Sequence, residues 1–263
     1  MSRGLRTVAA CLWLSAGAGT QAAVDAGPAT APRMEFTPLP AGSYRLPQIQ
    51  SVADATLLDE RGQSVRLSSV TNGKITLLTF FYTYCADPLG CPFVHETMTW
   101  LRSRIARDHE LAHRVRFVAI SCDPTTDTPE VLARYAGELA DDSRFEWRFL
   151  TARSVPELLP VIDDFGQDVS VELDRSGRPT RALHHMLKVF LIDGRGKVRE
   201  IYSLAYLQPQ VMLNDMRTLY MERQGTVERG GAAHAHGAGA ATAARVRVIS
   251  RPPAEVPARR SGP

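Results

Sequence analysis

A single stretch of the chain, residues 75 to 105, places two cysteines between a buried strand and a helix. Ile75 to Tyr82 (ITLLTFFY) is β-branched and aromatic and carries no charge, which is typical of a strand buried on both faces. Cys85 and Cys91 follow, and Pro92 then suits the first turn of a helix. The later apolar positions recur at helical spacing: Val94, Met98, Leu101 and Ile105. We therefore expect the rest of the chain to be organised around a strand, a two-thiol loop and a helix.

Cys91 is predicted to stand at, or just before, the start of this helix. The backbone N–H groups of a helix N-terminus have no partner within the helix and favour an anion, so we expect a thiolate at Cys91 with a lowered pKa. Such a thiol attacks disulfides, and once deprotonated it is a soft ligand for Cu(I) or zinc. The alternative is a structural disulfide between Cys85 and Cys91, but a bridge across so short a loop constrains the unfolded chain little. The pair therefore favours redox or metal chemistry.

The remaining patterns alternate between strands and helices. A second buried strand is predicted over Val115 to Ser121 (VRFVAIS). Further strands are predicted over 52–58, 64–67, 145–150, 169–173, 181–183, 186–193 and 198–204, and helices from about 128 and over 155–165 and 208–222. This order predicts an α/β, thioredoxin-like fold in which a central mixed sheet is flanked by helices and carries added β-hairpins.

The ends of the chain differ in composition from this domain, which we expect over residues 48–224. Residues 1–23 are predicted to be a signal peptide, with Arg3 and Arg6 ahead of an uncharged, mostly apolar run from 7 to 20. An uncleaved membrane anchor is the alternative, so we expect a periplasmic protein that is either free or anchored. Residues 24–47, rich in Ala, Pro and Gly, predict a linker, and residues 225–263 predict a disordered tail.

Bulk composition places the chain among ordinary globular proteins, with 44% hydrophobic and 22% charged residues. The formal net charge of +3 does not indicate a nucleic-acid partner. Removal of the signal would leave Cys85, Cys91 and Cys122. Because an odd number of cysteines in an oxidising compartment points to a free or exchanging thiol, the count agrees with a working thiol pair.

The predicted topology brings these cysteines toward histidines that lie far along the chain. Sites in open α/β sheets form at the carboxyl ends of parallel strands, where Cys85 and Cys91 follow one strand and Cys122 follows the next. His184 and His185 immediately precede a later predicted strand. If that strand runs antiparallel to the other two, it starts where they finish, so we expect three thiols and an imidazole at one edge of the sheet.

Three segments form a recognisable pattern: 77–85 (LLTFFYTYC), 123–131 (DPTTDTPEV) and 185–193 (HMLKVFLID). In sequence, order and separation they resemble the Sco/SenC family, which are copper-binding, thioredoxin-fold chaperones for the assembly of cytochrome c oxidase. The resemblance implies copper chaperone activity and a partner that is an oxidase subunit carrying a copper centre, or another copper protein.

The resemblance also implies a ligand set. One copper ion per chain, Cu(I) or Cu(II), would be held by Cys85, Cys91 and His185, with His184 as a neighbour only. The chain departs from the family pattern in two places. Its Cys-x5-Cys loop is two residues longer than the usual Cys-x3-Cys, although Pro92 is kept, and Cys122 replaces a small apolar residue. Cys122 is therefore a candidate third thiol, and a small core hydrophobe is the alternative.

Other polar residues near the predicted site have simpler interpretations. His95 lies one helical turn after Cys91, within reach of a metal, but we expect it to be an exposed helix histidine. Asp127 or Thr128 is expected to cap the next helix, and Asp123 and Asp127 are expected to cap and turn the backbone. His234 in the tail, and the neighbouring His236, are expected to stay with the flexible segment.

Two functions remain open at this point. The first is an exported metallochaperone that passes copper to an oxidase subunit by ligand exchange. The second is an enzyme, a thiol–disulfide oxidoreductase in which one thiolate attacks a partner's disulfide and the other resolves the mixed disulfide. A histidine aligned with the thiols favours the first, and the absence of a Cys-x-x-Cys motif weakens the second. Thiol–disulfide oxidoreductases are also expected as partners. A peroxide-reducing thioredoxin relative finds no specific support in this spacing.

Overall fold

The structure is a computed structural model that describes residue 31 and residues 36–225. The predicted signal peptide, residues 24–30 and 32–35 of the predicted linker, and the predicted tail beyond Gly225, with His234 and His236, lie outside the described residues. Within the described part of the chain, no helix is both long enough and apolar enough to cross a membrane. Among the described residues, regular structure begins at Gln50 and ends at Gln224.

The predicted elements appear in their expected order along the chain, and the structure adds a short first strand, two short helices and a 3-10 turn. The strands are β1 (Gln50–Ser51), β2 (Thr56–Asp59), β3 (Ser64–Arg66), β4 (Ile75–Phe81), β5 (Val115–Ser121), β6 (Trp147–Thr151), β7 (Val169–Leu173), β8 (Pro179–His185), β9 (Lys188–Ile192) and β10 (Lys197–Ser203). The helices are α1 (Leu67–Thr71), α2 (Cys91–Ile105), α3 (Pro129–Ala136), α4 (Glu138–Asp141), α5 (Val155–Asp164) and α6 (Pro209–Gln224), with a 3-10 turn, η1 (Leu204–Tyr206).

Eight of the strands form one mixed sheet with the order β1-β10-β9-β4-β5-β6-β2-β3. The central strands β4 and β5 are parallel, and all seven residues of each are buried, as the apolar runs predict. Strand β6 continues the parallel set, whereas β9 pairs with β4 in the antiparallel sense. The antiparallel strand on which the predicted convergence depends is therefore confirmed, as is the thioredoxin-like α/β fold.

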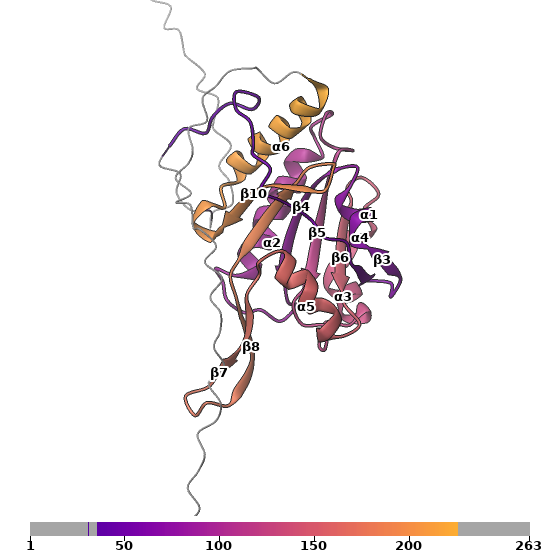
Figure 1. Cartoon of the computed structure of the whole chain (residues 1–263), viewed down its shortest axis with the longest axis vertical. Coiled ribbons are helices and arrows are strands. Elements are labelled where there is room, and N and C mark those ends of the chain that lie inside the picture. The colour runs from indigo at the N-terminus through magenta and orange to yellow at the C-terminus, as the bar shows by residue number, and fades with distance from the viewer. Residues whose placement is uncertain (1–30, 32–35, 226–263) are drawn as a thin grey trace, which may run out of the picture.

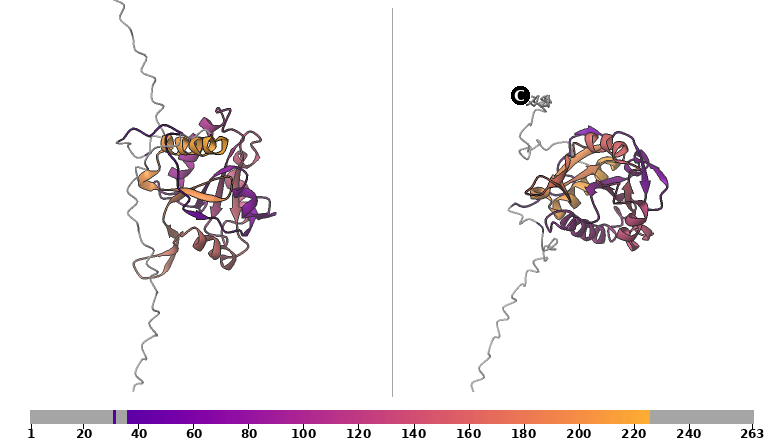
Figure 2. Two further views of the ribbon diagram at one scale, coloured as in Figure 1. Left: turned by 45° about the horizontal axis from the view of Figure 1, so that its top comes forward. Right: turned by 90° about the horizontal axis from the view of Figure 1, so that it is seen from below.

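Helices cover both faces of this sheet (Figures 1 and 2). The sheet separates the core into two clusters, one on each face. One cluster joins the sheet to α2, α3 and α6, and its fully buried side chains include Phe93, Met98 and Phe117. The other cluster joins the opposite face to α1 and α5 and includes Leu78 and Phe190. Cys91 belongs to the first cluster, on the face of the sheet that α2 covers.

The hairpin β7–β8 forms a separate two-stranded sheet that projects from the body of the domain (Figure 1). Its second strand is longer than expected and already contains His184 and His185, whereas β9 begins only at Lys188. The prediction that the histidines precede the central antiparallel strand directly is therefore wrong in detail. They end the projecting hairpin, and the short link to β9 still brings them to the carboxyl end of β4.

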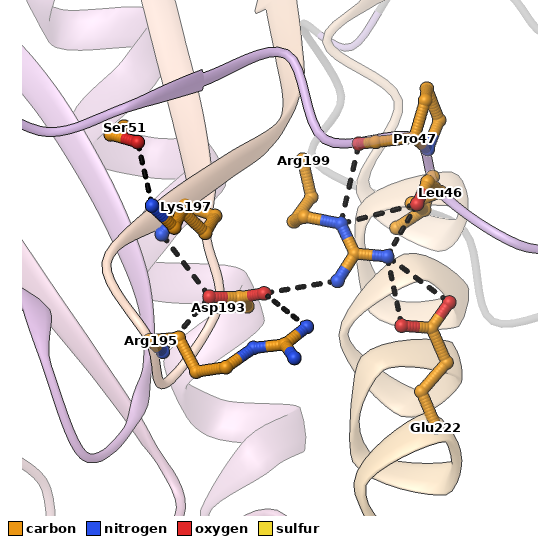
Figure 3. Close-up of polar contacts among 8 residues, drawn as sticks. All are labelled: Leu46, Pro47, Ser51, Asp193, Arg195, Lys197, Arg199 and Glu222. Atoms are coloured by element: carbon orange, nitrogen blue, oxygen red, sulfur yellow. Dashed lines mark hydrogen bonds and ion pairs between the residues drawn. The ribbon is translucent and has the colours of Figure 1, made fainter.

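A buried arginine ties the beginning of the domain to its last helix (Figure 3). The Arg199 guanidinium on β10 pairs with Asp193 at 3.0 Å and with Glu222 of α6 at 2.8 Å. It also donates to the backbone carbonyls of Leu46 and Pro47. Residues that we expected to belong to the linker are therefore held against the folded domain before β1 begins.

Candidate metal centre

Two chain segments deliver the three predicted ligands to one place. Cys85 lies in the loop after β4, Cys91 is the first residue of α2, and His185 is the last residue of β8. The Cys91 Sγ and His185 Nε2 atoms are 3.6 Å apart, although 94 positions separate the two residues in the sequence. A metal bonded to sulfur at about 2.3 Å and to nitrogen at about 2.0 Å, with a tetrahedral angle between them, separates the two donors by about 3.5 Å. The spacing therefore fits both an S–H···N contact and a shared metal.

The longer loop folds back so that Cys85 stays beside Cys91. The N–H of Gly90 donates to the Asp87 carbonyl at 2.9 Å, which closes a turn immediately before α2. A Cβ placed on Gly90 would lie only 3.3 Å from the Cys85 sulfur, so a glycine is what allows the loop to pass that close. Both cysteines are free thiols, Cys85 partly buried and Cys91 buried.

The acidity of the two thiols is the reverse of what we expected. Burial acts to raise the pKa of the Cys85 thiol, but the backbone N–H of Cys91, the Tyr82 hydroxyl and the backbone of Asp87 stabilise its thiolate, and the net pKa is lowered. Burial raises the pKa of the Cys91 thiol. The prediction of an acidic Cys91 is wrong because its sulfur is buried in the core. The backbone N–H group at the start of α2 stabilises the thiolate of Cys85 instead.

His185 has the properties of a neutral ligand. Burial lowers the pKa of its imidazole, which keeps the ring uncharged near neutral pH. The ring packs edge-on against Tyr82, with 5.8 Å between centroids, and Tyr82 in turn donates to the Leu183 carbonyl at 3.2 Å. His184 is exposed, in keeping with its expected role as a neighbour. Within the residues that the structure describes, no three Cys, His, Asp or Glu side chains already surround a metal position. Cys91 and His185 are thus the preformed pair, and the three-ligand set stays a prediction.

The SCO1/SenC family model matches residues 47–221 of the chain. The chain belongs to the SCO1/SenC family. Among individual relatives, it is 27% identical over 150 residues to the SCO1 protein homolog of Bacillus subtilis, a match that covers 56% of this chain and 71% of that relative.

Solved structures of SCO1/SenC relatives share the fold of this chain. The apo Sco1 protein from Thermus thermophilus superposes with a TM-score of 0.52 at 26% identity, covering 68% of this chain and 96% of that structure. Copper-bound ScoI from Arabidopsis thaliana gives 0.53 at 20% identity, with 65% and 98% covered. BsSco, a member of the Sco family of cytochrome c oxidase assembly proteins, gives 0.51 at 23% identity, with 68% and 98% covered. These likenesses agree with the thioredoxin-like fold described above.

Cys122, the additional thiol of this SCO1/SenC chain, occupies the other core cluster. Its side chain is buried among residues of the face that α1 and α5 cover. Burial, followed by the charges of Asp127 and Asp123, raises its pKa to about 12. Cys122 therefore remains a protonated thiol near neutral pH, as a small core residue would, and its role as a third functional thiol stays a prediction.

Asp127 has a function that sequence reasoning missed. Its fully buried carboxylate accepts the Thr83 N–H at 3.0 Å and the Ser121 hydroxyl at 2.6 Å. The Thr83 hydroxyl donates to the same carboxylate at 2.5 Å. Thr128, not Asp127, occupies the N-cap position of α3, and it makes no side-chain capping bond. Of the two expected caps, Thr128 is therefore the one at the helix start, and Asp127 instead holds the turn that leads from β4 to Cys85.

His95 is not the exposed helix residue that we expected. Its ring stacks on Trp147 with 5.3 Å between centroids and packs edge-on near Tyr135 at 6.0 Å. Burial lowers its pKa. A groove of 540 Å³ beside the thiols is lined by His95 together with Cys85 and Cys91. His95, one turn after Cys91 on α2, therefore lines the same groove as the two predicted cysteine ligands.

Proposed function

We propose that this chain is an exported copper metallochaperone that assists assembly of the copper centre of cytochrome c oxidase. Copper is its cargo, one ion per chain, held by Cys85, Cys91 and His185. The observation that carries the proposal is the 3.6 Å approach of Cys91 Sγ to His185 Nε2. Membership of the SCO1/SenC family supports it, since relatives with this fold include a copper-bound protein and a cytochrome c oxidase assembly protein.

The donor set suits both oxidation states of copper. Thiolates are soft ligands that favour Cu(I), and an imidazole helps to hold Cu(II). Cys85 is the more acidic and the more accessible thiol, so it supplies the first thiolate and is the ligand that a partner reaches first. Transfer then proceeds by ligand exchange to a copper protein, such as the oxidase subunit that carries the copper centre. Export to the periplasm rests on residues 1–23 of the sequence, with a retained anchor as the alternative.

Cu(II) binding by the reduced protein tests this assignment. We expect one Cu(II) per chain and a thiolate-to-copper charge-transfer absorption, which requires a sulfur ligand. The variant C85S removes one sulfur ligand and should reduce the absorption, H185A removes the nitrogen ligand and should shift its wavelength, and each should weaken binding by about tenfold or more. H184A is the matched control, because this adjacent histidine is exposed. Absence of the absorption in the wild-type protein, or an absorption and an affinity that H185A leaves unchanged, would overturn the ligand set.

A second function is favoured by the unequal thiols. Cys85 is partly exposed and has a lowered pKa, whereas Cys91 is buried behind it. This is the arrangement of an attacking and a resolving thiol in a thiol–disulfide oxidoreductase. A C91S variant should then trap a mixed disulfide between Cys85 and a partner's cysteine. No trapped species, together with no turnover of a disulfide substrate by the wild-type protein, would exclude the enzyme.

A further inference from the structure

His185 reaches Cys91 from a hairpin that lies outside the main sheet. Among the described residues, β7 and β8 pair only with each other, and the hairpin projects from the body of the domain (Figure 1). The two strands pair as far as Val169 and His185, which places His185 at the base of the hairpin. Because the main sheet does not include β8, contacts with the body of the domain must set the position of this imidazole.

Two hydrogen bonds from the body of the domain hold the backbone on either side of His185. Before it, the Tyr82 hydroxyl at the end of β4 donates to the Leu183 carbonyl at 3.2 Å. After it, the side-chain amide of Gln167 donates from Nε2 to the Met186 carbonyl at 2.6 Å. Both carbonyls lie within two residues of His185, so these two bonds, here called the flanking bonds, bracket the predicted ligand.

The imidazole of His185 itself makes few polar contacts. Its Nδ1 atom is buried and makes no well-formed hydrogen bond within the described residues. Its Nε2 atom lies 3.6 Å from the Cys91 sulfur, and the ring packs edge-on against Tyr82 with 5.8 Å between centroids. The position of the ring therefore depends on packing and on its backbone, which the flanking bonds fix.

Both donors of the flanking bonds are buried. Tyr82 is 6% and Gln167 3% exposed. The backbone N–H of Gln167 donates to the Ile162 carbonyl of α5 at 2.9 Å, which anchors Gln167 to the body of the domain. A buried donor that loses its acceptor costs more free energy than one that water can reach. Displacement of the end of β8 would leave both donors without acceptors, so both favour the observed position of His185.

We propose that Tyr82 and Gln167 are positioning residues that hold His185 at the copper site through the flanking bonds. The inference rests on the proposed function, in which His185 is a copper ligand. The apparent dissociation constant rises as the fraction of chains with a ligand in place falls, so a ligand held in position before the ion arrives gives tighter binding. Neither positioning residue is a metal ligand, and the ligand set is the same with or without the flanking bonds.

Variants that each remove one donor test this role in the full chain. Y82F keeps the aromatic ring, and Q167M keeps most of the side-chain volume. We expect each to weaken Cu(II) binding about threefold and Y82F/Q167M about tenfold, as the loss of one and of two hydrogen bonds of ordinary strength predicts. The thiolate-to-copper absorption of the copper-bound protein should keep its wavelength in all three variants, because the ligands are unchanged.

The His185 ring of the metal-free protein gives a second measurement, which a general loss of stability does not move. An aromatic ring shifts the NMR resonances of nuclei packed against it, and the phenylalanine of Y82F retains such a ring beside His185. The His185 ring resonances should therefore move toward those of an exposed histidine only if the end of β8 leaves its place. We expect this movement in each single variant and a larger one in Y82F/Q167M.

Each variant has a matched control elsewhere in the chain. Y84F removes a hydroxyl that donates to Asp123 at 2.7 Å. Q50M removes a side-chain amide that donates to the Asp164 carbonyl at 2.8 Å. Both controls lose a hydrogen bond of the same kind, but neither bond touches the backbone around His185. Their copper affinity and their His185 resonances should match those of the wild type.

The outcomes separate this inference from the ligand set. Wild-type affinity and wild-type His185 resonances in Y82F/Q167M would overturn the positioning role. Weaker binding in Y82F with unchanged binding in Q167M would also overturn it, and would assign the effect to Cys85, whose thiolate the Tyr82 hydroxyl stabilises. Failure of the proposed function has a different signature, because H185A would then leave both the affinity and the absorption unchanged. Spectra of the backbone amides report whether each variant is folded, and the single variants decide the question if the double variant is not.

Discussion

The backbone N–H of Cys91 stabilises the sulfur of Cys85 rather than that of its own side chain. The start of α2 thus favours an anion, as helix N-termini do, but the anion belongs to the residue six positions earlier. The Cys91 sulfur points into the core instead and approaches His185. This division gives the pair one acidic, accessible thiol and one buried, weakly acidic thiol, and it has a direct consequence for reactivity.

Cys85 should be alkylated before the other thiols in metal-free, reduced protein. Its pKa is lowered, so the reactive thiolate persists as the pH falls from 9 toward neutrality and is lost only below the usual range for a thiol. Burial raises the pKa of Cys91 and that of Cys122, so both stay protonated and slow at neutral pH. Mass spectrometry of iodoacetamide-treated protein at several pH values measures this order. C85S should lack the fast phase, and faster labelling of Cys91 than of Cys85 would contradict the assignment.

Removal of the Asp127 carboxylate should destabilise the turn before the thiols. D127A leaves the Thr83 N–H, the Thr83 hydroxyl and the Ser121 hydroxyl without their acceptor in a buried place. Loss of charge-assisted hydrogen bonds of this kind costs about 3 kcal/mol in the free energy of unfolding. Urea unfolding measures the change, and D141A is the control because the Asp141 carboxylate is exposed and pairs only at the surface. Equal stability of the two variants would show that Asp127 does not hold the turn.

The central sheet was predictable because its strands are encoded locally. The runs at 75–82 and 115–121 contain too many β-branched and aromatic residues for an exposed strand, and the structure buries every residue of β4 and β5. The approach of Cys91 to His185 was also predictable, since strand order alone brings their elements to one edge. The resemblance to the family selected His185 over His184.

Other features depend on contacts that no local pattern records. The burial of His95 is decided by Trp147, which lies on a strand more than fifty positions later. The acidity of Cys85 depends on how the loop from Cys85 to Cys91 folds back, and the composition of that loop does not specify this. The role of Asp127 likewise follows from acceptor contacts with Thr83, on a different strand end. Each of these errors concerns the partner of a side chain, whereas the predicted elements lie within a few residues of their positions in the structure; the short elements β1, α1 and α4 were not predicted.

Truncation of Arg199 should cost far more stability than truncation of a neighbouring arginine. R199A leaves the Asp193 and Glu222 carboxylates without their buried partner, which costs about 3–5 kcal/mol in the free energy of unfolding. It also removes the donor to the carbonyls of Leu46 and Pro47, so the segment before β1 should become sensitive to protease. R195A is the control: Arg195 also pairs with Asp193, but 79% of its side chain is exposed. We expect its unfolding midpoint to match that of the wild type, and an equal loss in both variants would refute the anchoring role of Arg199.

A methyl group on Gly90 should disturb the predicted centre without disturbing the fold. In G90A the new Cβ would lie 3.2 Å from the Asp87 carbonyl oxygen and 3.3 Å from the Cys85 sulfur, closer than ordinary contacts, so the sulfur must shift away from the start of α2. The Cys91 N–H then stabilises the Cys85 thiolate less, and the pKa of Cys85 should rise toward its ordinary value. Alkylation of Cys85 at neutral pH should slow, and Cu(II) should bind about tenfold more weakly, as happens when a ligand is displaced from its position. The buried contact between Cys91 and His185 does not involve Gly90, so the thermal midpoint should change little. If G90A binds Cu(II) as tightly as the wild type while Cys85 reactivity falls, Cys85 is a redox thiol rather than a metal ligand.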